Sequence, residues 1–336
     1  MLGFAIGPVL WAPLSELYGR QPLYAITFGI LTAFTIGCAV AEDIQTLLVL
    51  RFFSGAFGVS VMTNSGGTVA DLFTPAERGL AMIAMSVPGL MGPVLGPLVS
   101  GFLSEAAGWR WVQGACAIFT GVVWLCFLFF VPETYGPVVL RKRAQELSFR
   151  TGHVYVSKMD VGQEKKTLTK AIGIALTRPW ALLVHEPIVL MLSLYIAIAY
   201  GTLYLFFEGF PIVYQQGRGW SAGMGGLAFI GVAVGFLTGC LYCVFDDRRY
   251  LRLVRQHDGF APPESRLPPV IIGGLAMPVG LFWFAWTNGP EIHWIVSIVG
   301  SSFFGFGFVL VYLGVLNYLI DSYTIFVSYS PPAASA

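Results

Sequence analysis

Ala12-Pro-Leu-Ser-Glu-Leu-Tyr-Gly-Arg20 is a short polar turn between two apolar stretches that approach membrane length. The stretch before it starts at Met1, and the next one is uncharged over residues 23–41. A helix needs about 20 apolar residues to cross a bilayer. A tight turn with a carboxylate, a glycine and an arginine between two such helices favours a transporter that moves. It is a weak feature for an enzyme or a receptor.

The composition of the whole chain indicates a membrane protein. It is 56% hydrophobic and 11% charged, whereas soluble domains carry about 25% charged residues. Apolar runs of membrane length recur at 23–41, 46–70, 79–104, 111–132, 187–207, 219–245, 267–290 and 292–320. Only Arg51 and His293 interrupt them. With the stub before Glu16, we expect nine crossings. The predicted fold class is therefore an all-α, polytopic membrane protein with about nine transmembrane helices.

The basic residues are distributed unequally between alternate loops. With the Glu16–Arg20 turn assigned to the cytoplasm, sixteen of the 19 lysines and arginines fall on the cytoplasmic side. Two fall outside, Arg110 and Arg218, and Arg51 is embedded. This bias follows the positive-inside rule. We therefore expect an integral, multi-pass protein, placed in the plasma membrane, with a cytoplasmic central loop.

One long polar stretch divides the chain. We expect an N-terminal helix bundle over 1–132, a central cytoplasmic loop over 133–179, a C-terminal bundle over 180–321 and an irregular tail over 322–336. The loop either holds a short amphipathic helix around 139–149 or is a solvated linker.

A further motif lies in the run 79–104, where small residues recur every four positions and prolines lie among them. Small residues let membrane helices approach closely, and proline removes helix hydrogen bonds. Pro88, Gly92, Gly96 and Ser100 recur at this spacing, with Pro93 and Pro97 among them, and predict either a packing ridge or a bendable seam.

Together these motifs resemble the major facilitator superfamily, and within it the fungal drug:proton antiporters of the twelve-helix class. The opening turn is similar to the family's motif between helices two and three, with Glu16 in place of aspartate and Gln21 in place of a basic residue. The resemblance also rests on further segments, Arg51-Phe-Phe-Ser-Gly55, Gly92-Pro-Val-Leu-Gly96-Pro97-Leu-Val-Ser100-Gly101, Pro132-Glu-Thr-Tyr135, Glu186-Pro-Ile188, Tyr200-Gly-Thr-Leu-Tyr204 and Leu281-Phe-Trp-Phe-Ala-Trp-Thr287. On this alignment the crossings correspond to family helices two to ten, so the chain looks truncated at both ends.

The resemblance implies proton-coupled efflux of a small organic compound by alternating access. The substrate classes are a secondary metabolite or toxin, a drug or a polyamine. Because family helices one, eleven and twelve have no counterpart, the alternative is a transport-inactive remnant of such a transporter.

The resemblance further implies a cytoplasmic gate at the opening turn. Its motif residues are Glu16, Gly19 and Arg20, and Asp71 and Arg78 are their expected local partners. Glu16 and Arg20 are also spaced i, i+4, which suits an exposed ion pair, and such a pair contributes little to the stability of the protein.

Three ionisable residues are candidates for proton coupling. Arg51 lies inside an apolar run, and an intramembrane charge is a functional-site hypothesis by default; the alternative is an arginine that snorkels to the interface. Glu208 and Asp321 are the other two, although Glu208 is near an outer helix end and Asp321 near an inner one. The resemblance places Arg51 in the proton-coupling motif.

Polar residues at helical spacing predict the substrate cavity. Tyr200, Tyr204 and Glu208 lie four residues apart, on a helix that lines the central cavity in the family. Asn317 and Asp321 repeat this spacing on the last crossing.

We expect the protein to be no enzyme, because there is no nucleotide-binding loop and no paired acid–base cluster. No metal site and no cofactor are expected. The expected partners are a small-molecule substrate, protons and the lipid bilayer, without nucleic acid and without an obligate protein partner.

Overall fold

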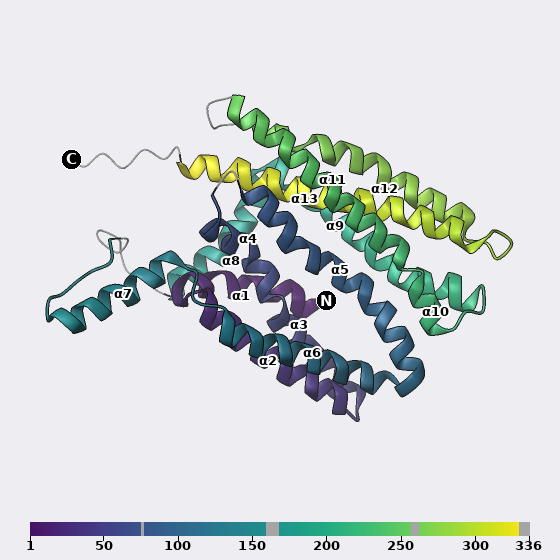
Figure 1. The fold of residues 1–336 in the computed structure, drawn as a ribbon, viewed down its shortest axis with the longest axis horizontal. Helices are drawn as coiled ribbons and strands as arrows, with labels where there is room; N and C mark the ends of the chain where they lie inside the picture. The colour runs from purple at the N-terminus through teal and green to yellow at the C-terminus, as the bar shows by residue number, and fades with distance from the viewer. Residues whose placement is uncertain (75–76, 159–167, 257–261, 329–336) are drawn as a thin grey trace. The chain divides into compact units, whose positions relative to one another are not determined.

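The computed structural model describes residues 1–74, 77–158, 168–256 and 262–328, and every regular element in these ranges is a helix (Figure 1). Among the described helices, eight are long and apolar enough to cross a membrane. The ninth expected crossing is the N-terminal stub, which forms a helix of 17 residues, α1 (Leu2–Tyr18). The all-α, polytopic fold class is confirmed.

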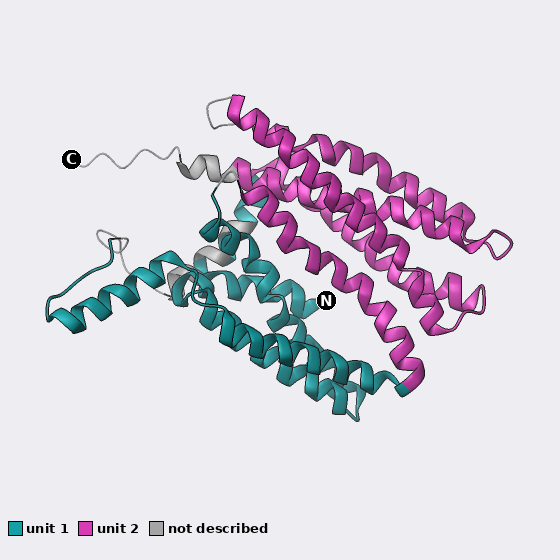
Figure 2. Ribbon diagram, in the orientation of Figure 1, with its two compact units in different colours: residues 1–75, 107–185 teal, residues 76–106, 186–336 magenta. Residues whose placement is uncertain are grey.

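The chain divides into two compact units, which Figure 2 shows in different colours. Unit 1 comprises Met1–Pro75 and Ala107–His185, and unit 2 comprises Ala76–Ala106 and Glu186–Ala336. The expected bundles at 1–132 and 180–321 differ from these units in α5 (Arg78–Ala107), which belongs to unit 2, and in the stretch 133–185, which belongs to unit 1. The two bundles therefore stay a prediction from the sequence.

Unit 1 is built around α2, which packs on α6 and α3. The indole Nε1 of Trp124 on α6 donates to the carbonyl oxygen of Ala25 at 2.7 Å, and Gly29 lets the ring approach the α2 backbone. Gly3 and Gly7 similarly allow α1 to approach α3. The other helices of this unit are α2 (Arg20–Val40), α3 (Ile44–Gly58), α4 (Ser60–Leu72), α6 (Trp109–Phe130), α7 (Gly136–Thr151) and α8 (Leu168–His185).

Unit 2 is built around its last helix, α13 (Trp294–Ser328), which packs on α11, α12, α9 and η2. Phe304 and Phe308 on this helix are fully buried, together with Phe210 and Phe236. Glycines on α11 and α12 allow the helices to approach α13 closely. The remaining elements are α9 (Pro187–Phe210), the π-helix η1 (Pro211–Gln216), α10 (Ala222–Leu227), α11 (Ile230–Gln256), the 3₁₀-helix η2 (Pro263–Arg266) and α12 (Pro268–Thr287).

The polar central stretch is more helical than a linker. Of the two alternatives for 139–149, the structure has the helix, α7, and a second helix, α8, runs past the expected loop end at 179 to His185. Part of the loop, 159–167, lies outside the described residues. The expected tail boundary at 322 also differs, because α13 continues to Ser328. Residues 329–336 lie outside the described residues.

Candidate functional site

A single glycine separates α1 from α2. Gly19 has φ 102°, a left-handed conformation that costs glycine little and strains residues with a Cβ. Its Cα faces the carboxylate of Glu133, so a side chain at this position would collide with that carboxylate. The turn needs glycine for both reasons, and it places Arg20 at the start of a new helix.

Glu133 caps this new helix from a distant part of the sequence. Its Oε1 accepts from the backbone N–H of Arg20 at 3.0 Å, and its Oε2 accepts from the N–H of Gln21 at 3.3 Å. The N–H groups of Thr134 and Tyr135 also donate to Oε1. The first N–H groups of a helix lack partners within the helix and favour a negative charge. The carboxylate therefore fixes the linker between α6 and α7 to the α1–α2 turn.

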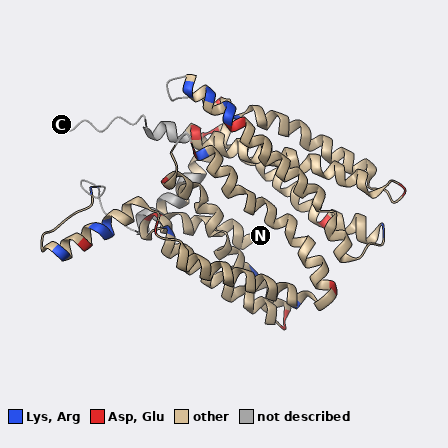
Figure 3. Cartoon of the chain, in the orientation of Figure 1, with Lys and Arg blue, Asp and Glu red and all other residues tan. Residues whose placement is uncertain are grey.

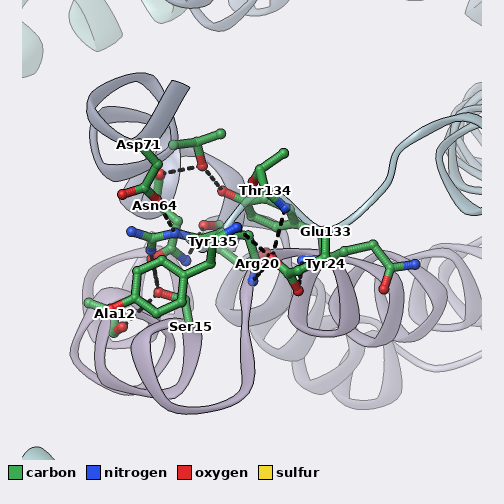
Figure 4. A network of polar contacts seen from close by, with 12 residues as sticks. Ala12, Ser15, Arg20, Tyr24, Asn64, Asp71, Glu133, Thr134 and Tyr135 are labelled. Carbon is green, nitrogen blue, oxygen red and sulfur yellow. Dashed lines mark hydrogen bonds and ion pairs between the residues drawn. The ribbon is translucent and has the colours of Figure 1, made fainter. Parts of the chain in front are cut away.

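The side chain of Arg20 is the centre of a buried network that joins three helices (Figure 4). Its Nε lies 3.2 Å from Oδ2 of Asp71 on α4. One NH₂ group donates to Ser15 Oγ on α1 at 2.5 Å and to Asn64 Oδ1 on α4 at 3.3 Å. Only 7% of Arg20 is exposed. We call Ser15, Arg20, Asn64, Asp71 and Glu133 the Arg20 cluster.

The Arg20 guanidinium leaves no room for a residue larger than glycine at position 67. Gly67 on α4 lies against its NH₂ group, and the ring of Tyr135 lies 5.2 Å below the guanidinium carbon. Arginine presents a planar fork of donors that lysine lacks. The site therefore selects arginine by shape, charge and donor number.

The structure differs from the expected i, i+4 ion pair between Glu16 and Arg20. The i, i+4 spacing requires one continuous helix, but α1 ends at Tyr18 and α2 begins at Arg20. The recorded ion pair of Arg20 is with Asp71. Glu16 acts on Tyr135 instead: burial, and then the charge of Glu16, raises the pKa of the Tyr135 hydroxyl above its ordinary value.

Of the expected gate residues, the structure therefore brings Gly19, Arg20 and Asp71 together. Arg78 begins α5 in unit 2, and its part in the gate stays a prediction.

Unit 2 contains a second buried arginine with carboxylates around it. The Arg266 side chain donates to Asp247 Oδ1 on α11 at 2.9 Å and to Asp321 Oδ2 on α13 at 3.0 Å. Its guanidinium carbon lies 3.3 Å from the ring centre of Tyr250, whose hydroxyl donates to Asp321 at 3.1 Å. We call Asp247, Tyr250, Arg266 and Asp321 the Arg266 cluster. It ties α11, η2 and α13 together at one end.

A small polar cavity of about 20 Å³ adjoins the Arg266 cluster. Asp246, Asp247, Arg266 and Asn317 line it together with apolar side chains. This volume is sufficient for one water molecule. Asn317, expected in a substrate cavity, therefore lies beside the charged cluster, in a space too small for an organic compound.

The small-residue motif on α5 divides into packed and open positions. Gly101 lies against Ala222 and Gly223 of α10, and Gly226 lies against the backbone of Pro97. A Cβ at Gly92 or Gly96 would meet no atom within 4 Å in unit 2. Beside this contact, Glu105 Oε1 accepts from the N–H of Gly223 at 2.7 Å. Packing against α10 therefore requires Gly101, whereas it does not require Gly92 or Gly96.

We predict opposite effects for alanine at two of these glycines. A Cβ at position 101 would lie 2.6 Å from the Ala222 carbonyl oxygen, so Gly101→Ala should lower the free energy of unfolding by about 1–3 kcal/mol. Gly96→Ala should raise it by about 0.5–1 kcal/mol, because alanine favours helix over glycine. Thermal unfolding of the detergent-solubilised protein, followed by circular dichroism, measures both. Equal midpoints for the two variants would contradict the packing described here.

The predicted polar stripe on α9 does not form one surface. Tyr200 packs edge-on against Phe308 and Tyr312 of α13 and hydrogen-bonds with the Tyr312 hydroxyl. Tyr204 and Glu208 are exposed. Tyr200 thus fastens α9 to α13, and Tyr204 remains the more accessible of the two tyrosines.

The three proton-coupling candidates lie in different surroundings. Arg51 on α3 is exposed, and its side chain makes no hydrogen bond or ion pair with the described residues. Glu208 is exposed near the end of α9. Asp321 is held by Arg266 and Tyr250. Arg51 belongs to unit 1, whereas Glu208 and Asp321 belong to different helices of unit 2.

The sequence alone does not predict the roles of several residues in the two clusters. Glu133 has a signal, because it stands directly after an apolar run and inside the segment Pro132–Tyr135 that carries the resemblance. Asn64 is an amide within a run that is otherwise nearly apolar. The others have no distinguishing local pattern, namely Ser15, Asp247, Tyr250 and Arg266.

These features define a polytopic helical membrane protein in which each of two units buries an arginine-centred polar cluster. The profile of the Major Facilitator Superfamily matches residues 1–329. The chain belongs to this superfamily, and it is an integral, multi-pass membrane protein.

Several fungal proteins of this superfamily are similar in sequence. The chain is 59% identical to the MFS-type efflux pump MFS2 of Trichophyton rubrum over 328 residues, which is 98% of this chain and 55% of that protein. It is 55% identical to the multidrug transporter mdrA of Aspergillus fumigatus, over 98% of this chain and 54% of that one. It is 52% identical to the efflux pump FUB11 of Gibberella moniliformis, over 100% and 57%. The chain thus spans about half the length of these relatives.

Solved structures show the same fold at low sequence identity. The proton:xylose symporter XylE matches with a TM-score of 0.62 and 20% identity, over 95% of this chain and 70% of that one. This similarity supports the fold alone.

Proposed function

We propose that this chain carries the transport function of a proton-coupled efflux pump that exports a small organic compound by alternating access. The observation that carries the proposal is the complete Arg20 cluster, which occupies the place where the family resemblance puts the cytoplasmic gate. It connects the ends of α1, α2 and α4 with the linker between α6 and α7. The names of three fungal relatives, two efflux pumps and a multidrug transporter, support the direction of transport.

The clusters support a mechanism of rigid units. Polar groups held in a network of hydrogen bonds and ion pairs resist local deformation, and each cluster lies within one unit. Alternating access proceeds largely by rocking of one helix bundle against another about a site near the middle of the membrane. In this proposal, the Arg20 and Arg266 clusters both lie on the cytoplasmic side, and each keeps the helix ends of its own unit together during that motion.

Proton coupling is assigned first to Arg51 and Glu208, which are not engaged in either cluster. Asp321 has its carboxylate committed to Arg266 and Tyr250, so we assign it to the support of α13. Tyr204 is the preferred substrate contact on α9 because it is exposed. The substrate is a secondary metabolite or toxin, a drug or a polyamine, and the membrane is the plasma membrane.

Efflux from vesicles tests this proposal. Vesicles that contain the chain and a fluorescent drug should release the drug when a proton gradient is imposed, and an ionophore should stop the release. Glu208→Gln should reduce gradient-driven release towards that of empty vesicles while substrate exchange without a gradient continues, because only the proton-binding group is lost.

Glu291→Gln is the matched control, since it makes the same chemical change at an exposed turn between α12 and α13. It should leave release unchanged. If vesicles with the unmodified chain behave like empty vesicles, transport by this chain is disproved. If release is normal in Glu208→Gln, the assignment of Glu208 is disproved.

A further inference from the structure

The end of α7 displays large apolar side chains outside the candidate membrane spans. Phe149 is 93% exposed, Val154 is 91% exposed and Val156 is 64% exposed. Lipid accounts for exposed apolar residues on the spanning helices, but α6 ends at Phe130 and the candidate spans resume only at Pro187. We call residues 147–156 the α7 tip. Its apolar side chains need another explanation.

The α7 tip has a defined backbone structure. Gly152 has φ 70° and ends the helix in a left-handed conformation, so the chain turns back. The N–H of Tyr155 then donates to Ser148 Oγ at 2.8 Å, and Ser148 Oγ donates to the carbonyl oxygen of Ala144 at 2.8 Å. The residues after the turn are thereby fixed beside the last turn of α7, and the apolar side chains of both segments are displayed at the same end.

Positive charge accompanies these apolar side chains. Arg141, Lys142, Arg143 and Arg150 on α7 are exposed, against one acidic residue, Glu146. Figure 3 shows this concentration of basic residues along the helix. Glu146 pairs with Arg150 at 2.5 Å, which leaves a net positive helix. Basic and apolar residues together are the composition of helices that bind at a membrane interface.

The position of α7 in unit 1 places it near the membrane surface. It starts at Gly136, shortly after the membrane helix α6 ends at Phe130. Glu133, between the two helices, is bonded to the N-terminus of α2. The start of α7 is therefore held at the boundary where two spanning helices begin or end.

We propose that α7 and its tip bind the anionic phospholipid surface of the adjacent membrane leaflet, with Phe149, Val154 and Val156 inserted among the head groups. The basic residues of α7 supply the electrostatic attraction, which strengthens binding about fivefold for each Lys or Arg at the surface. The apolar tip supplies the buried area. This inference does not depend on transport activity.

Hydrogen–deuterium exchange of the full chain in lipid nanodiscs tests the proposal. Amides of residues 147–156 should exchange more slowly in nanodiscs that contain phosphatidylserine than in nanodiscs of phosphatidylcholine alone, and high salt should remove the difference. Replacing Arg141, Arg143 and Arg150 together with glutamine should remove the lipid dependence. Phe149→Ser with Val154→Ser should reduce the protection in both lipids.

Two substitutions on α7 serve as controls. Gln145→Ser changes an exposed neutral residue and should have no effect, whereas Glu146→Gln removes the acidic residue and should increase protection by phosphatidylserine. Equal exchange in the two lipids would overturn the proposal.

Discussion

Arg20→Ala is expected to lower the free energy of unfolding by about 1.5–3 kcal/mol, because it removes the hydrogen bonds of a buried charged group. The substitution leaves Asp71 without its cation and removes the donor to Ser15 and Asn64. Thermal unfolding of the detergent-solubilised protein measures the change. Arg20→Lys should recover only part of it, because an ammonium group has no planar fork to serve these acceptors together.

Arg150→Ala is the control for Arg20→Ala. Arg150 also pairs with a carboxylate, but its side chain is 72% exposed, and exposed pairs contribute about 1 kcal/mol or less. The two variants remove the same group, so their difference reports burial. Unfolding of Arg20→Ala at the temperature of the unmodified protein would contradict the role assigned to the Arg20 cluster.

Arg266→Met is expected to have a larger effect in unit 2, about 3–5 kcal/mol, because it leaves a buried charge unpaired. Asp247 is only 6% exposed and would remain buried without its cation. Adding Asp247→Asn should restore a large part of the loss, since the uncompensated charge is then removed. Methionine retains much of the apolar contact with Tyr250.

A nearby arginine supplies the comparison for Arg266→Met. Arg249 pairs with Asp246 at 2.8 Å, but its side chain is 42% exposed, so Arg249→Ala should cost far less. If Asp247→Asn adds a further loss to Arg266→Met, an unpaired carboxylate is not the source of the instability. Because Arg20 and Arg266 lie in separate units and share no recorded partner, the effects of Arg20→Ala and Arg266→Met should be additive.

The membrane helices could be predicted from the sequence because the bilayer imposes a simple requirement. A helix that crosses lipid must satisfy its backbone internally and present apolar side chains, and this requirement is visible in each run separately. The order of residues along the chain is therefore sufficient to predict the eight candidate spans and the family. The uneven distribution of basic residues likewise predicts a topology without knowledge of packing.

The geometry at the opening turn could not be predicted in the same way. The i, i+4 interpretation of Glu16 and Arg20 assumes a continuous helix, and the left-handed Gly19 breaks it. The partner of Arg20, Asp71, lies 51 residues away, and only the family resemblance indicates it. Local spacing carries no information about such a contact.

The Arg266 cluster shows the same limit in unit 2. Its arginine and Asp321 are 55 residues apart, and each stands next to the end of an apolar run in the sequence, where charged residues are ordinary. Asp321 is visible in the sequence as an acidic residue at the end of a long apolar run, but its engagement with Arg266 and Tyr250 depends on how α11, η2 and α13 pack. Only the three-dimensional structure supplies that arrangement.

The membership of α5 in unit 2 has a consequence for biosynthesis. Glu105 and its partner Gly223 are 118 positions apart, so the ribosome needs about 6–24 seconds between them at a rate of about 5–20 residues per second. During this interval α5 must reside in the membrane before α10 and α11 exist. Synthesis of unit 2 thus begins early in translation, with α5, and ends only when α13 has been made.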